Sequence, residues 1–439
     1  MQYNVVDGFG VPRLTRAWGE RRGVGGAATT GYDRFMELPI NSGALADIRV
    51  VDLSRVLAGP FCTMLLADYG AEVIKVEQPG SGDPTRAWGP PWVGDDAAAE
   101  RQSAYYLTAN RNKRGMTLDL KSTAGLAVAR RLIATADVVV ENFMPGTLAR
   151  VGLDYDTLAA AHPDLVYCSI TGYGQTGPYR DRPGFAVVAE AMGGLRHLSG
   201  EPGRVPVRCG VSLGDTLAAL HGVIGVLLAL QYRSRTVSPA APKGVGQVVD
   251  VALYESVFNC MESLLPEYSA FGVVREPAGS ALPGIAPSNA YRCADGHVLV
   301  AGNGDSIFKR LMQAIGRSDL AADPQLAGNT GRVARVAEID AAIGDWTAPR
   351  TVAEVLDVLD AARVPGGRIY TVADIAADPH YRARGMLQEV TLEDGSRLTV
   401  PGIVPKLSRT PGGHRRNAPK LGHDTVEVLA ELAAKPPRA

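Results

Sequence analysis

The stretch Ile48-Arg-Val-Val-Asp-Leu53, with the turn Ser54-Arg-Val-Leu-Ala-Gly-Pro60 after it, decides the fold that the sequence predicts. Ile48 to Leu53 alternates in the way that a strand does. A helix is expected from about Phe61 to Tyr69, because Gly70 closes it, and the apolar run Glu72-Val-Ile-Lys-Val-Glu77 predicts a second strand. A strand, a helix and a strand in this order indicate a parallel βαβ unit.

The same alternation continues downstream and predicts an α/β domain with a doubly wound sheet. In such domains the ligand binds at the carboxyl ends of the strands, so the loops after Leu53, Glu77, Glu141 and Ile170 should line a pocket. The further predicted elements are a strand from Gly115 to Leu120, a helix from Gly125 to Ala134, a strand Asp137-Val-Val-Val-Glu141, a helix from Gly146, a strand Leu165-Val-Tyr-Cys-Ser-Ile170 and a strand Gln247-Val-Val-Asp-Val-Ala-Leu253 followed by a helix through Leu265.

Two other regions depart from this pattern. Residues 1–44 contain many glycines, have no sustained apolar period and no hydrophobic core of a secretory signal, so we expect an N-terminal extension. After the flexible segment 275–289, a hairpin with the turn Asp295-Gly296 and several helices predict a smaller α+β domain. The predicted parts are therefore an extension (1–44), the first part of a large domain (45–270), a linker (271–289), a small α+β domain (290–375) and a C-terminal part (376–439) with strands around Gln388 and Leu398 and a helix after Asp424.

Composition excludes several classes of function. The 439 residues are 46% hydrophobic and 21% charged, with a formal net charge of -1, so no nucleic-acid partner is indicated. The apolar run from Leu217 to Leu230 is shorter than a membrane span, so we predict a buried helix and no membrane partner. Five scattered cysteines without a CxxC pair argue against a disulfide framework or a metal site and fit a cytoplasmic protein.

Asp215 stands at the start of this apolar run, and only His221 interrupts the stretch without acids or bases that extends to Arg233. An ionised carboxylate there loses hydration, which costs roughly several kcal/mol unless the group is paired or hydrogen-bonded. One interpretation is a helix N-cap, since Gly-Asp before an apolar-periodic run is a good helix start. The other is a catalytic carboxylate at a helix N-terminus in an apolar pocket. The two interpretations are compatible.

The run Gly172-Tyr-Gly-Gln-Thr-Gly177 matches the dinucleotide pattern GxGxxG and follows a predicted strand. That pattern requires a helix to begin inside the motif, and Pro178 and Pro183 break such a helix. No suitable acid ends a following strand, and the chain has no GxxxxGK[ST] loop for phosphoryl transfer. We therefore expect no bound NAD or FAD.

Two glycine-containing loops, Leu57-Ala-Gly-Pro60 and Gly80-Ser-Gly-Asp83, allow a ligand to approach the backbone closely at the predicted carboxyl edge. Basic residues can supply positive charge at the same end, although each of them taken singly also fits a solvated surface residue. A ligand with phosphates and a flat ring would suit this combination. The basic residues are Lys75, Arg86, Arg111, Lys113, Arg114 and Arg150.

The chain carries a series of motifs in one order: Val51-Asp-Leu-Ser-Arg-Val-Leu-Ala-Gly-Pro60, Gly70-Ala-Glu-Val-Ile-Lys-Val-Glu77, Gly80-Ser-Gly-Asp83, Asn110-Arg-Asn-Lys-Arg114, Val140-Glu-Asn-Phe143, Pro145-Gly146, Ser169-Ile-Thr-Gly-Tyr-Gly174, Gly244-Val-Gly-Gln-Val-Val-Asp250 and Leu421-Gly-His423. Together they resemble the family III CoA-transferases, which include formyl-CoA transferase, carnitine CoA-transferase and the alpha-methylacyl-CoA racemases. The resemblance covers nearly everything from about Asp47 to the C-terminus.

This resemblance implies a site and an assembly. Asp215 aligns with the catalytic aspartate of the family. The fold would be a Rossmann-like large domain, which both chain ends help to build, and a small domain on two linkers, in an interlocked ring-like homodimer. CoA or acyl-CoA would be the substrate, with no tightly bound cofactor. The CoA-binding candidates are Val56, Leu57 and Ala58 in the first loop, Asn142, Phe143 and Arg150 further on, and the basic Lys113 and Arg114.

Departures from the family pattern narrow the choice within it. The racemases carry a histidine where this chain has Phe185, and a phenyl ring cannot exchange protons. Leu57 replaces the glutamine of formyl-CoA transferase, and Gly284-Ile-Ala-Pro287 is poorer in glycine than the mobile loop of that enzyme. The stretches from Thr85 to Gly94 and from Tyr167 to Pro178 look closest to the succinate-hydroxymethylglutarate CoA-transferase branch.

We therefore expect an acyl-CoA:carboxylate CoA-transferase that moves CoA from a donor such as succinyl-CoA to a short dicarboxylic acid through covalent intermediates on Asp215. Backbone N–H groups around Gly214 or in the loop 284–289 are candidates for stabilising an oxyanion. Two alternatives stay open, a 2-methylacyl-CoA epimerase with Asp215 as base and an acyl-CoA-binding protein without chemistry. Candidates for a distal substrate carboxylate, which surface placement would explain equally well, are Arg182, Arg196 and His197.

Overall fold

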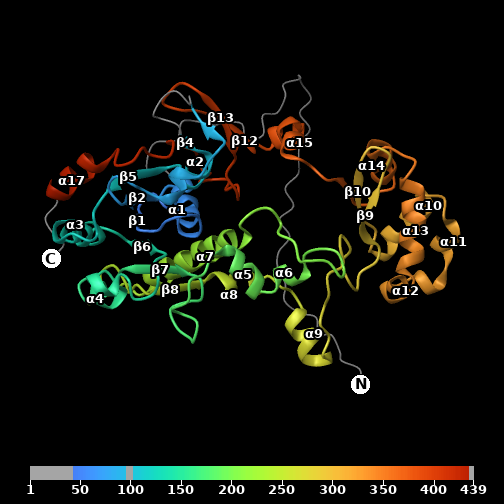
Figure 1. Cartoon of the computed structure of the whole chain (residues 1–439), viewed down its shortest axis with the longest axis horizontal. Coiled ribbons are helices and arrows are strands. Elements are labelled where there is room, and N and C mark those ends of the chain that lie inside the picture. The colour runs from blue at the N-terminus through green and yellow to red at the C-terminus, as the bar shows by residue number, and fades with distance from the viewer. Residues whose placement is uncertain (1–42, 95–101, 435–439) are drawn as a thin grey trace, which may run out of the picture. The chain divides into compact units, whose positions relative to one another are not determined.

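The computed structural model describes residues 43–94 and 102–434. Residues 39–439 form one compact unit, and its largest element group is a parallel sheet with helices on both faces (Figure 1). Our prediction of an N-terminal extension over residues 1–44 lies outside the described residues except at its last two positions.

Six strands form the large sheet, and every neighbouring pair in it is parallel. Numbered along the chain, their order is 3-2-1-4-5-6, which is the order of doubly wound sheets and confirms that prediction. The order reverses between β1 and β6, and a ligand of such a sheet binds beyond this switch point. In spatial order the strands are β5 (Lys113–Thr117), β2 (Glu72–Glu77), β1 (Arg49–Asp52), β6 (Val138–Glu141), β7 (Val166–Thr171) and β8 (Val248–Ala252).

Helices cover both faces of this sheet. On one face, α1 (Ala58–Asp68) and α7 (Leu213–Arg235) share a hydrophobic core with the strands. On the other face, α3 (Thr123–Ile133) and α17 (Thr425–Ala434) contribute to a second core. Successive side chains of a strand point to opposite faces, so the neighbours Val50 and Val51 are both fully buried but belong to different cores.

The long helix α7 begins at the carboxyl edge of the sheet. Near its end, Arg233 donates to Asp137 (Nη1···Oδ1 3.1 Å), which directly precedes β6 and so marks the amino edge. At 1.5 Å per residue, Asp215 lies about 27 Å from Arg233 along the helix axis. The longest strands of the sheet have six residues, which span about 20 Å. The first turn of α7 therefore reaches past the carboxyl ends of the strands.

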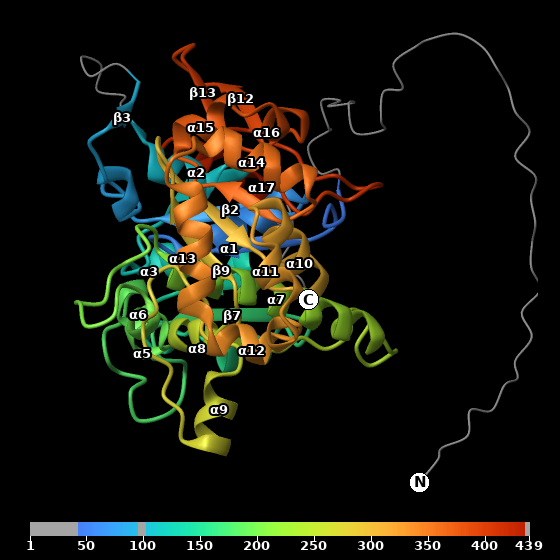
Figure 2. The same ribbon diagram turned by 90° about the vertical axis from the view of Figure 1, so that its right-hand side faces the viewer.

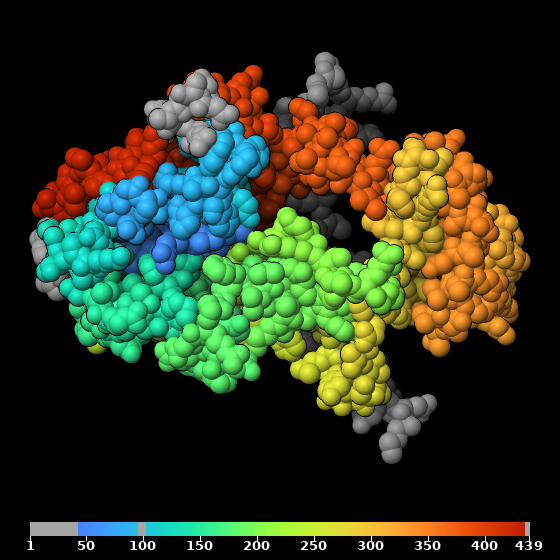
Figure 3. Space-filling model, viewed as in Figure 1, coloured from blue at the N-terminus to red at the C-terminus, as the bar shows by residue number. Residues whose placement is uncertain are grey.

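The C-terminal part of the chain completes the large domain beside β5, where segments distant in sequence meet on the surface (Figure 3). The N–H of Gly115 donates to Asp424 Oδ2 (2.7 Å), and Arg114 pairs with Glu431 (Nη2···Oε1 2.7 Å). Val428 of α17 is buried in the same core as strands β1 and β2. Residues from both ends of the described chain thus build one core.

A second, antiparallel sheet carries a core of its own, with helices packed beside it (Figure 2). The hairpin predicted at Asp295-Gly296 is confirmed, because β9 pairs with β10 across this turn. This core lies between Tyr291 and Val364, within the predicted small domain, whose boundaries stay a prediction. The elements are β9 (Ser288–Arg292), β10 (His297–Ala301), β11 (Gly366–Arg368), α10 (Asp305–Ala314), α11 (Ser318–Ala322), α12 (Asn329–Ala334), α13 (Val336–Thr347) and α14 (Val352–Ala361).

The other elements are short, and they include the hairpin and the final helix that were predicted for the C-terminal part. The strands are β3 (Trp92–Val93), β4 (Gln102–Ser103), β12 (Leu387–Thr391) and β13 (Arg397–Pro401), and the helices are α2 (Ala104–Asn110), α4 (Tyr155–Ala159), α5 (Ala186–Met192), α6 (Leu195–Leu198), α8 (Leu253–Phe258), α9 (Leu264–Phe271), α15 (Val372–Ala377) and α16 (Pro379–Ala383).

Two predicted helices have the wrong extent. The helix expected from Gly146 is only a 3-10 turn over Ala149–Val151 followed by α4, because the backbone of Gly146 and Gly152 is left-handed, with φ values of +77° and +66°. The helix expected to run through Leu265 is divided into α8 and α9, and Glu262 between them has φ +49°. In both cases a local reversal of φ interrupts an otherwise suitable apolar pattern.

Helix α7 is longer than the apolar run from Leu217 to Leu230, whose short length was our reason to exclude a membrane span. It has 23 residues with a mean hydropathy of 1.8, and among the described residues it is the one helix long and apolar enough to cross a membrane. Four of its large apolar side chains, at helical spacing, are exposed on the side away from the sheet. They are Leu220, Ile224, Leu227 and Leu228.

Candidate active site at the carboxyl edge

The loop between β1 and α1 lies at the switch point and is joined there to the loop after β6. The N–H of Arg55 donates to Asn142 Oδ1 (2.8 Å), and Asn142 Nδ2 donates to the carbonyl of Arg55 (2.6 Å). The Arg55 guanidinium lies over the ring of Phe143, 4.6 Å from its centroid. The structure therefore brings the predicted CoA-binding positions of the two loops, Val56 to Ala58 and Asn142 to Phe143, into one place.

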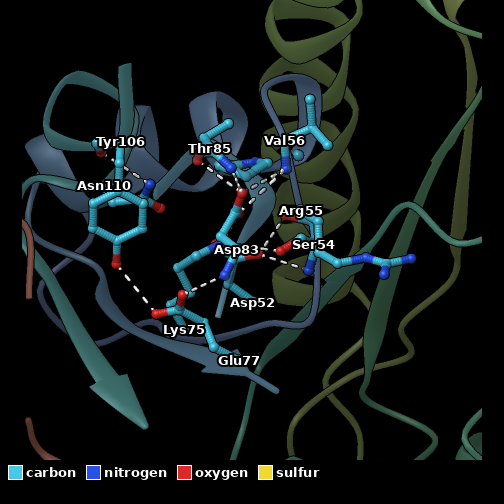
Figure 4. A network of polar contacts seen from close by, with 12 residues as sticks. Asp52, Ser54, Arg55, Val56, Lys75, Glu77, Asp83, Thr85, Tyr106 and Asn110 are labelled. Atoms are coloured by element: carbon cyan, nitrogen blue, oxygen red, sulfur yellow. Dashed lines mark hydrogen bonds and ion pairs between the residues drawn. The ribbon is translucent and has the colours of Figure 1, made fainter. Parts of the chain in front are cut away.

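Asp52, the last residue of β1, is the centre of a buried polar network beneath this loop (Figure 4). Its Oδ1 accepts bonds from the N–H (2.9 Å) and the hydroxyl of Ser54. Its Oδ2 accepts bonds from Thr63 Oγ1 (2.7 Å) and Lys113 Nζ (3.0 Å). Burial alone would raise the pKa of Asp52, but the charges of Lys113 and Lys75 and these hydrogen bonds lower it to about 2.

Lys75 and Asp83 form a second buried ion pair in the same network, with 2.9 Å between Nζ and Oδ2 and no exposed surface on either side chain. Lys75 also donates to the carbonyl of Ser54 (3.0 Å). Both oxygens of Asp83 accept the N–H of Val56 (3.3 and 3.2 Å), and Oδ1 also accepts the N–H (2.9 Å) and hydroxyl (2.7 Å) of Thr85. Burial opposes ionisation of Asp83, but Lys75 and the bonds from Thr85 hold its pKa below the usual value.

Asp215 lies in the first turn of α7, which begins at Leu213. The N-cap position belongs to Ser212, so the interpretation of Asp215 as the cap is wrong. The Asp215 side chain is half-buried, and within the described residues its carboxylate forms no hydrogen bond and no ion pair. The first turn of a helix favours a negative charge through its dipole. The helix dipole thus offsets part of the cost of burying the charge, and the carboxylate is left without a partner among the described residues.

The surroundings of Asp215 make it a more basic carboxylate than usual. Burial is the main cause that raises its pKa to about 6, the negative charge of Glu190 adds to the effect, and Arg208 opposes it. Glu190 of α5 is buried, and its Oε1 accepts the N–H of Gly214 (3.4 Å). Its Oε2 lies 3.9 Å from Arg208 Nε and 3.5 Å from Arg196 Nε. Asp215 thus stands among a second carboxylate and two guanidinium groups.

Lys113 and Arg114 both have partners within the fold. The side chain of Lys113 is fully buried, and its Nζ donates to Asp52, to the carbonyl of Pro60 (2.8 Å) and to Asn110 Oδ1 (2.8 Å). Burial lowers the pKa of Lys113 to about 8, although Asp52 opposes this. Their assignment to ligand binding stays a prediction, although both residues begin β5 and already pair with side chains of this chain. The partners of Arg114 are Glu72, Glu427 and Glu431.

Three other basic candidates are also used inside the fold, whereas Arg150 lies on the surface. It is exposed on the turn after β6, and its Nη2 lies 3.2 Å from Thr147 Oγ1. Sequence reasoning could not separate the internal cations from the external one, because each lies beside a loop that was expected to bind the ligand. The internal pairs are Lys75 with Asp83, Arg86 with Glu77 and Arg111 with Asp68.

Phe185 is the N-cap residue of α5, and 67% of its surface is exposed. The next residue, Ala186, packs against the first turn of α7, since a Cβ added at Gly214 would lie 3.0 Å from the carbonyl oxygen of Ala186. The structure thus places Phe185 one residue from a contact with the turn that carries Asp215, and its side chain can supply no proton.

The cations expected to hold a distal substrate carboxylate are dispersed. Arg182 stacks on Tyr179, with 3.9 Å from its guanidinium carbon to the ring centroid, and is exposed. His197 lies 3.5 Å from the exposed Glu276. Only Arg196 shares a partner, Glu190, with the surroundings of Asp215.

Three of the backbone groups proposed for an oxyanion site already have acceptors. The N–H of Gly214 donates to Glu190. In the loop 284–289, the N–H of Ile285 donates to the carbonyl of Leu282 (3.3 Å) and that of Ala286 to Asn329 Oδ1 (3.2 Å). These three groups would have to exchange partners before they could stabilise an oxyanion.

Sequence reasoning missed Glu190, Arg208 and Asp83 as members of the site. Glu190 had a signal, because it is the one charged residue in the apolar run from Phe185 to Met192 and so resembles Asp215. Asp83 was noted only for its loop. In the part of the chain that the structure describes, no group of three or more His, Cys, Asp and Glu side chains is placed to hold a metal ion.

Comparison with known proteins decides the family. The family model described as CoA-transferase family III matches residues 45–425. The chain belongs to CoA-transferase family III. The resemblance drawn from its motifs is thereby confirmed.

This family III CoA-transferase has similar relatives along nearly its whole length. It is 44% identical over 389 residues to the succinyl-CoA–D-citramalate CoA-transferase of Chloroflexus aurantiacus, with 88% of this chain and 94% of that protein covered. It is 38% identical over 398 residues to the succinate–glutarate CoA-transferase of Agrobacterium fabrum, with 90% and 97% covered. The crystal structure of a CaiB/BaiF family protein from Brucella suis superposes with a TM-score of 0.76 at 39% identity, covering 89% of this chain and all of that one.

Proposed function

We propose that this family III CoA-transferase moves CoA from succinyl-CoA to a short dicarboxylic acid, with Asp215 as the nucleophile. The observation that carries the proposal is the Asp215 carboxylate, which is half-buried, free of hydrogen-bond partners within the described residues and held past the carboxyl edge of the sheet. The relatives named above transfer CoA between succinyl-CoA or succinate and citramalate or glutarate, which supports this substrate class for the chain.

The proposed reaction has two symmetric halves. In the first, an oxygen of Asp215 attacks the thioester carbonyl, CoA leaves as the thiolate, and a mixed anhydride of Asp215 and succinate forms. The thiolate then attacks the aspartyl carbonyl, which releases succinate and leaves CoA on Asp215 as a thioester. In the second half, the acceptor carboxylate attacks this thioester, and the thiolate attacks the acceptor carbonyl of the new anhydride. Asp215 is regenerated as a carboxylate, and no proton is consumed.

A carboxylate with a pKa of about 6 suits this chemistry. At pH 7 or above it is ionised in about nine molecules of ten or more, and it is more basic than an ordinary aspartate. Its partial burial also limits the access of water, which would hydrolyse the anhydride and the thioester. Arg208 and Arg196 lie beside Glu190 in the same surroundings and support a substrate that carries a second carboxylate.

Mass spectrometry of the intact protein after mixing with succinyl-CoA tests the proposal. We expect an adduct of the mass of CoA less one water on Asp215, removed by hydroxylamine, and none on an Asp215→Asn protein. A protein that forms no adduct and exchanges the α-deuterium of a branched acyl-CoA would instead be an epimerase. Binding of CoA esters without either reaction would indicate a non-catalytic protein.

The pH dependence of the first half-reaction is expected to report the ionisation of Asp215. The value of kcat/KM for succinyl-CoA should fall tenfold per pH unit below about pH 6, because the protonated carboxyl cannot attack. Glu190 raises this pKa and Arg208 lowers it, so Glu190→Gln should move the midpoint down and Arg208→Leu should move it up. Initial rates between about pH 5 and pH 8 measure both shifts. Equal midpoints in the three proteins, or shifts of the opposite sign, would contradict this account.

We also propose that the chain acts as an interlocked homodimer in the cytoplasm. The exposed apolar stripe of α7 (Leu220, Ile224, Leu227 and Leu228) needs a cover, and a second copy supplies one without placing the charged ends of the helix in lipid. The Rossmann-like large domain would bind CoA in each copy. Five free cysteines, of which Cys209 and Cys260 are exposed, fit a reducing compartment.

Replacing Leu228, the most exposed member of this stripe at 65%, by Glu is expected to weaken the dimer. A charge buried in an interface without a partner costs several kcal/mol, so we expect the dissociation constant to rise at least about 100-fold. Light scattering after size-exclusion chromatography measures the mass. Leu429→Glu, on the exposed side of α17 at 38%, is the matched control and should stay dimeric. A monomeric wild-type protein that floats with lipid vesicles would support a membrane partner instead.

A further inference from the structure

Val56 holds a backbone conformation that β-branched residues rarely adopt, with φ +71°. Strain of this kind persists only where the surrounding structure over-determines it, and it is common at ligand sites. Val56 directly precedes Leu57 and Ala58 at the switch point, where a ligand of a doubly wound sheet binds. The contacts that hold Val56 therefore determine the shape of the loop at the place where the ligand binds.

Side chains from outside the loop bond its backbone, and those of Asp52, Lys75 and Asp83 are labelled in Figure 4. Asp52 accepts the N–H of Ser54, and Lys75 donates to the carbonyl of the same residue. Asn142 bonds both backbone groups of Arg55. The N–H of Val56 is directed at both carboxylate oxygens of Asp83. Asp83 is thus the acceptor for the one strained residue of the loop.

We propose that Asp83 is a positioning residue for CoA binding, and that its buried carboxylate, paired with Lys75, holds Val56 in the strained conformation that shapes the loop for the ligand. The inference rests on the proposed function, because it takes CoA as the ligand of this loop. It adds a role for Asp83, a residue of the neighbouring loop 80–83. In this role Asp83 acts through Val56 and does not contact CoA.

The carboxylate is suited to this role in a way that its amide is not. Its two oxygens serve three neighbours at once, Lys75, Val56 and Thr85. Asparagine would keep one acceptor oxygen, would turn an NH2 group toward other donors, and would leave the Lys75 ammonium buried without its closest partner. Asp83 is itself held in place, because its N–H donates to Glu77 Oε2 (2.8 Å).

Loss of Asp83 should affect binding more than chemistry. Asp215 is carried by α7, whose first turn is held by Glu190 of α5 and not by the network around Asp83. A loosened loop would have to be ordered again each time CoA binds, which weakens binding. The chemical step after binding would retain its nucleophile.

The test compares Asp83→Asn with the wild-type protein in steady-state kinetics, in calorimetric titration with CoA, and in hydrogen exchange. We expect KM for succinyl-CoA and Kd for CoA to rise at least about tenfold, with kcat within about threefold. The amide hydrogens of residues 54–58 should exchange faster. Thr85→Val removes only one donor to Asp83, so it tests the inference even if Asp83→Asn is unstable. It should raise KM about two- to fivefold and leave kcat nearly unchanged.

Asp68→Asn is the matched control. Asp68 is also a fully buried carboxylate in an ion pair, with 2.7 Å to Arg111 Nη2, but it ends α1 far from the loop. Its replacement should lower stability and leave KM for succinyl-CoA unchanged. If Asp68→Asn raised KM as much as Asp83→Asn, the effect would be general destabilisation and the inference would be wrong.

The outcomes also separate this inference from the proposed function. A wild-type protein that binds no CoA ester would overturn the proposed function. A wild-type protein that binds CoA, with an Asp83→Asn protein that binds it equally well and keeps slow exchange in residues 54–58, would overturn the inference alone. A fall in kcat without a change in KM would also overturn it, because a group acting through the binding loop does not produce that result.

Discussion

Replacing Asp215 by Asn is expected to lower kcat/KM for CoA transfer by about 1,000-fold or more, with CoA binding retained. Asparagine has nearly the same shape as aspartate but lacks the anionic oxygen that must attack the thioester. The loop that we assign to CoA belongs to β1 and α1 and not to α7, so its geometry should be unaffected. Chromatography of the CoA esters formed from succinyl-CoA and a panel of acids gives the rates.

Asp156→Asn is the control for this experiment, because Asp156 is also an acid in the first turn of a helix but lies exposed on α4. It should keep full activity. An Asp215→Asn protein that transferred CoA at the wild-type rate would rule out covalent catalysis by Asp215, whatever the substrates are.

The Asp215→Asn protein is also expected to be more stable than the wild-type protein at pH 8. Folding raises the pKa of Asp215 from 3.8 to about 6, so the charged form is disfavoured in the folded state. The cost is absent below about pH 4, grows between the two pKa values and is complete above about pH 6. Each pH unit between them corresponds to about 1.4 kcal/mol, and partial exposure reduces the total to about 1–2 kcal/mol. Thermal melts at pH 4 and pH 8 measure the difference.

Replacing Lys113 by Met is expected to lower the free energy of unfolding by about 3–5 kcal/mol. The side chains of Lys113 and Asp52 have no exposed surface, so the variant leaves the charge of Asp52 in the core without its 3.0 Å partner. The carbonyl of Pro60 and the amide oxygen of Asn110 lose a donor as well. Urea denaturation followed by circular dichroism measures the loss.

A double-mutant cycle with Asp52→Asn shows whether the charge pair is the cause. Each single change should be severe, and the double change should cost at least about 2 kcal/mol less than their sum. Strictly additive costs would contradict the ion-pair explanation. Lys243→Met is the matched control, because Lys243 pairs with Asp164 at 3.6 Å on the surface, and its loss should cost no more than about 1 kcal/mol.

The parallel sheet could be predicted from the sequence because its strands are buried on both faces. Glu72–Glu77 was predicted with the bounds that β2 has, since three of its four inner residues, Val73, Ile74 and Val76, are apolar and β-branched. The helix expected from Gly146 could not be judged in this way. Its pattern of apolar residues is suitable, but the backbone is left-handed at Gly146 and Gly152, and no local pattern reveals where a glycine takes that conformation.

The candidate site was predictable where one residue decides its chemistry and not where partners from distant strands decide it. Asp215 stood out because its neighbours in sequence are apolar. The role of Lys113 depends on Asp52, 61 residues away, and that of Asp83 on Lys75 and Val56. These pairs can be recognised only when the register of the parallel strands is known. An example is the pairing of Asp52 with Lys75 across β1 and β2.

The C-terminal segment that completes the core beside β5 sets the order of events during synthesis. The N–H of Gly115 donates to Asp424 and Arg114 pairs with Glu431, and both partners come more than 300 residues later in the chain. A nascent chain that has left the ribosome only as far as β8 has α3 on this face of the sheet but still lacks α17, so the part of the core that Val428 and Leu432 complete is not yet covered. We therefore expect the large sheet to bury this part of its core only after α17 has been synthesised.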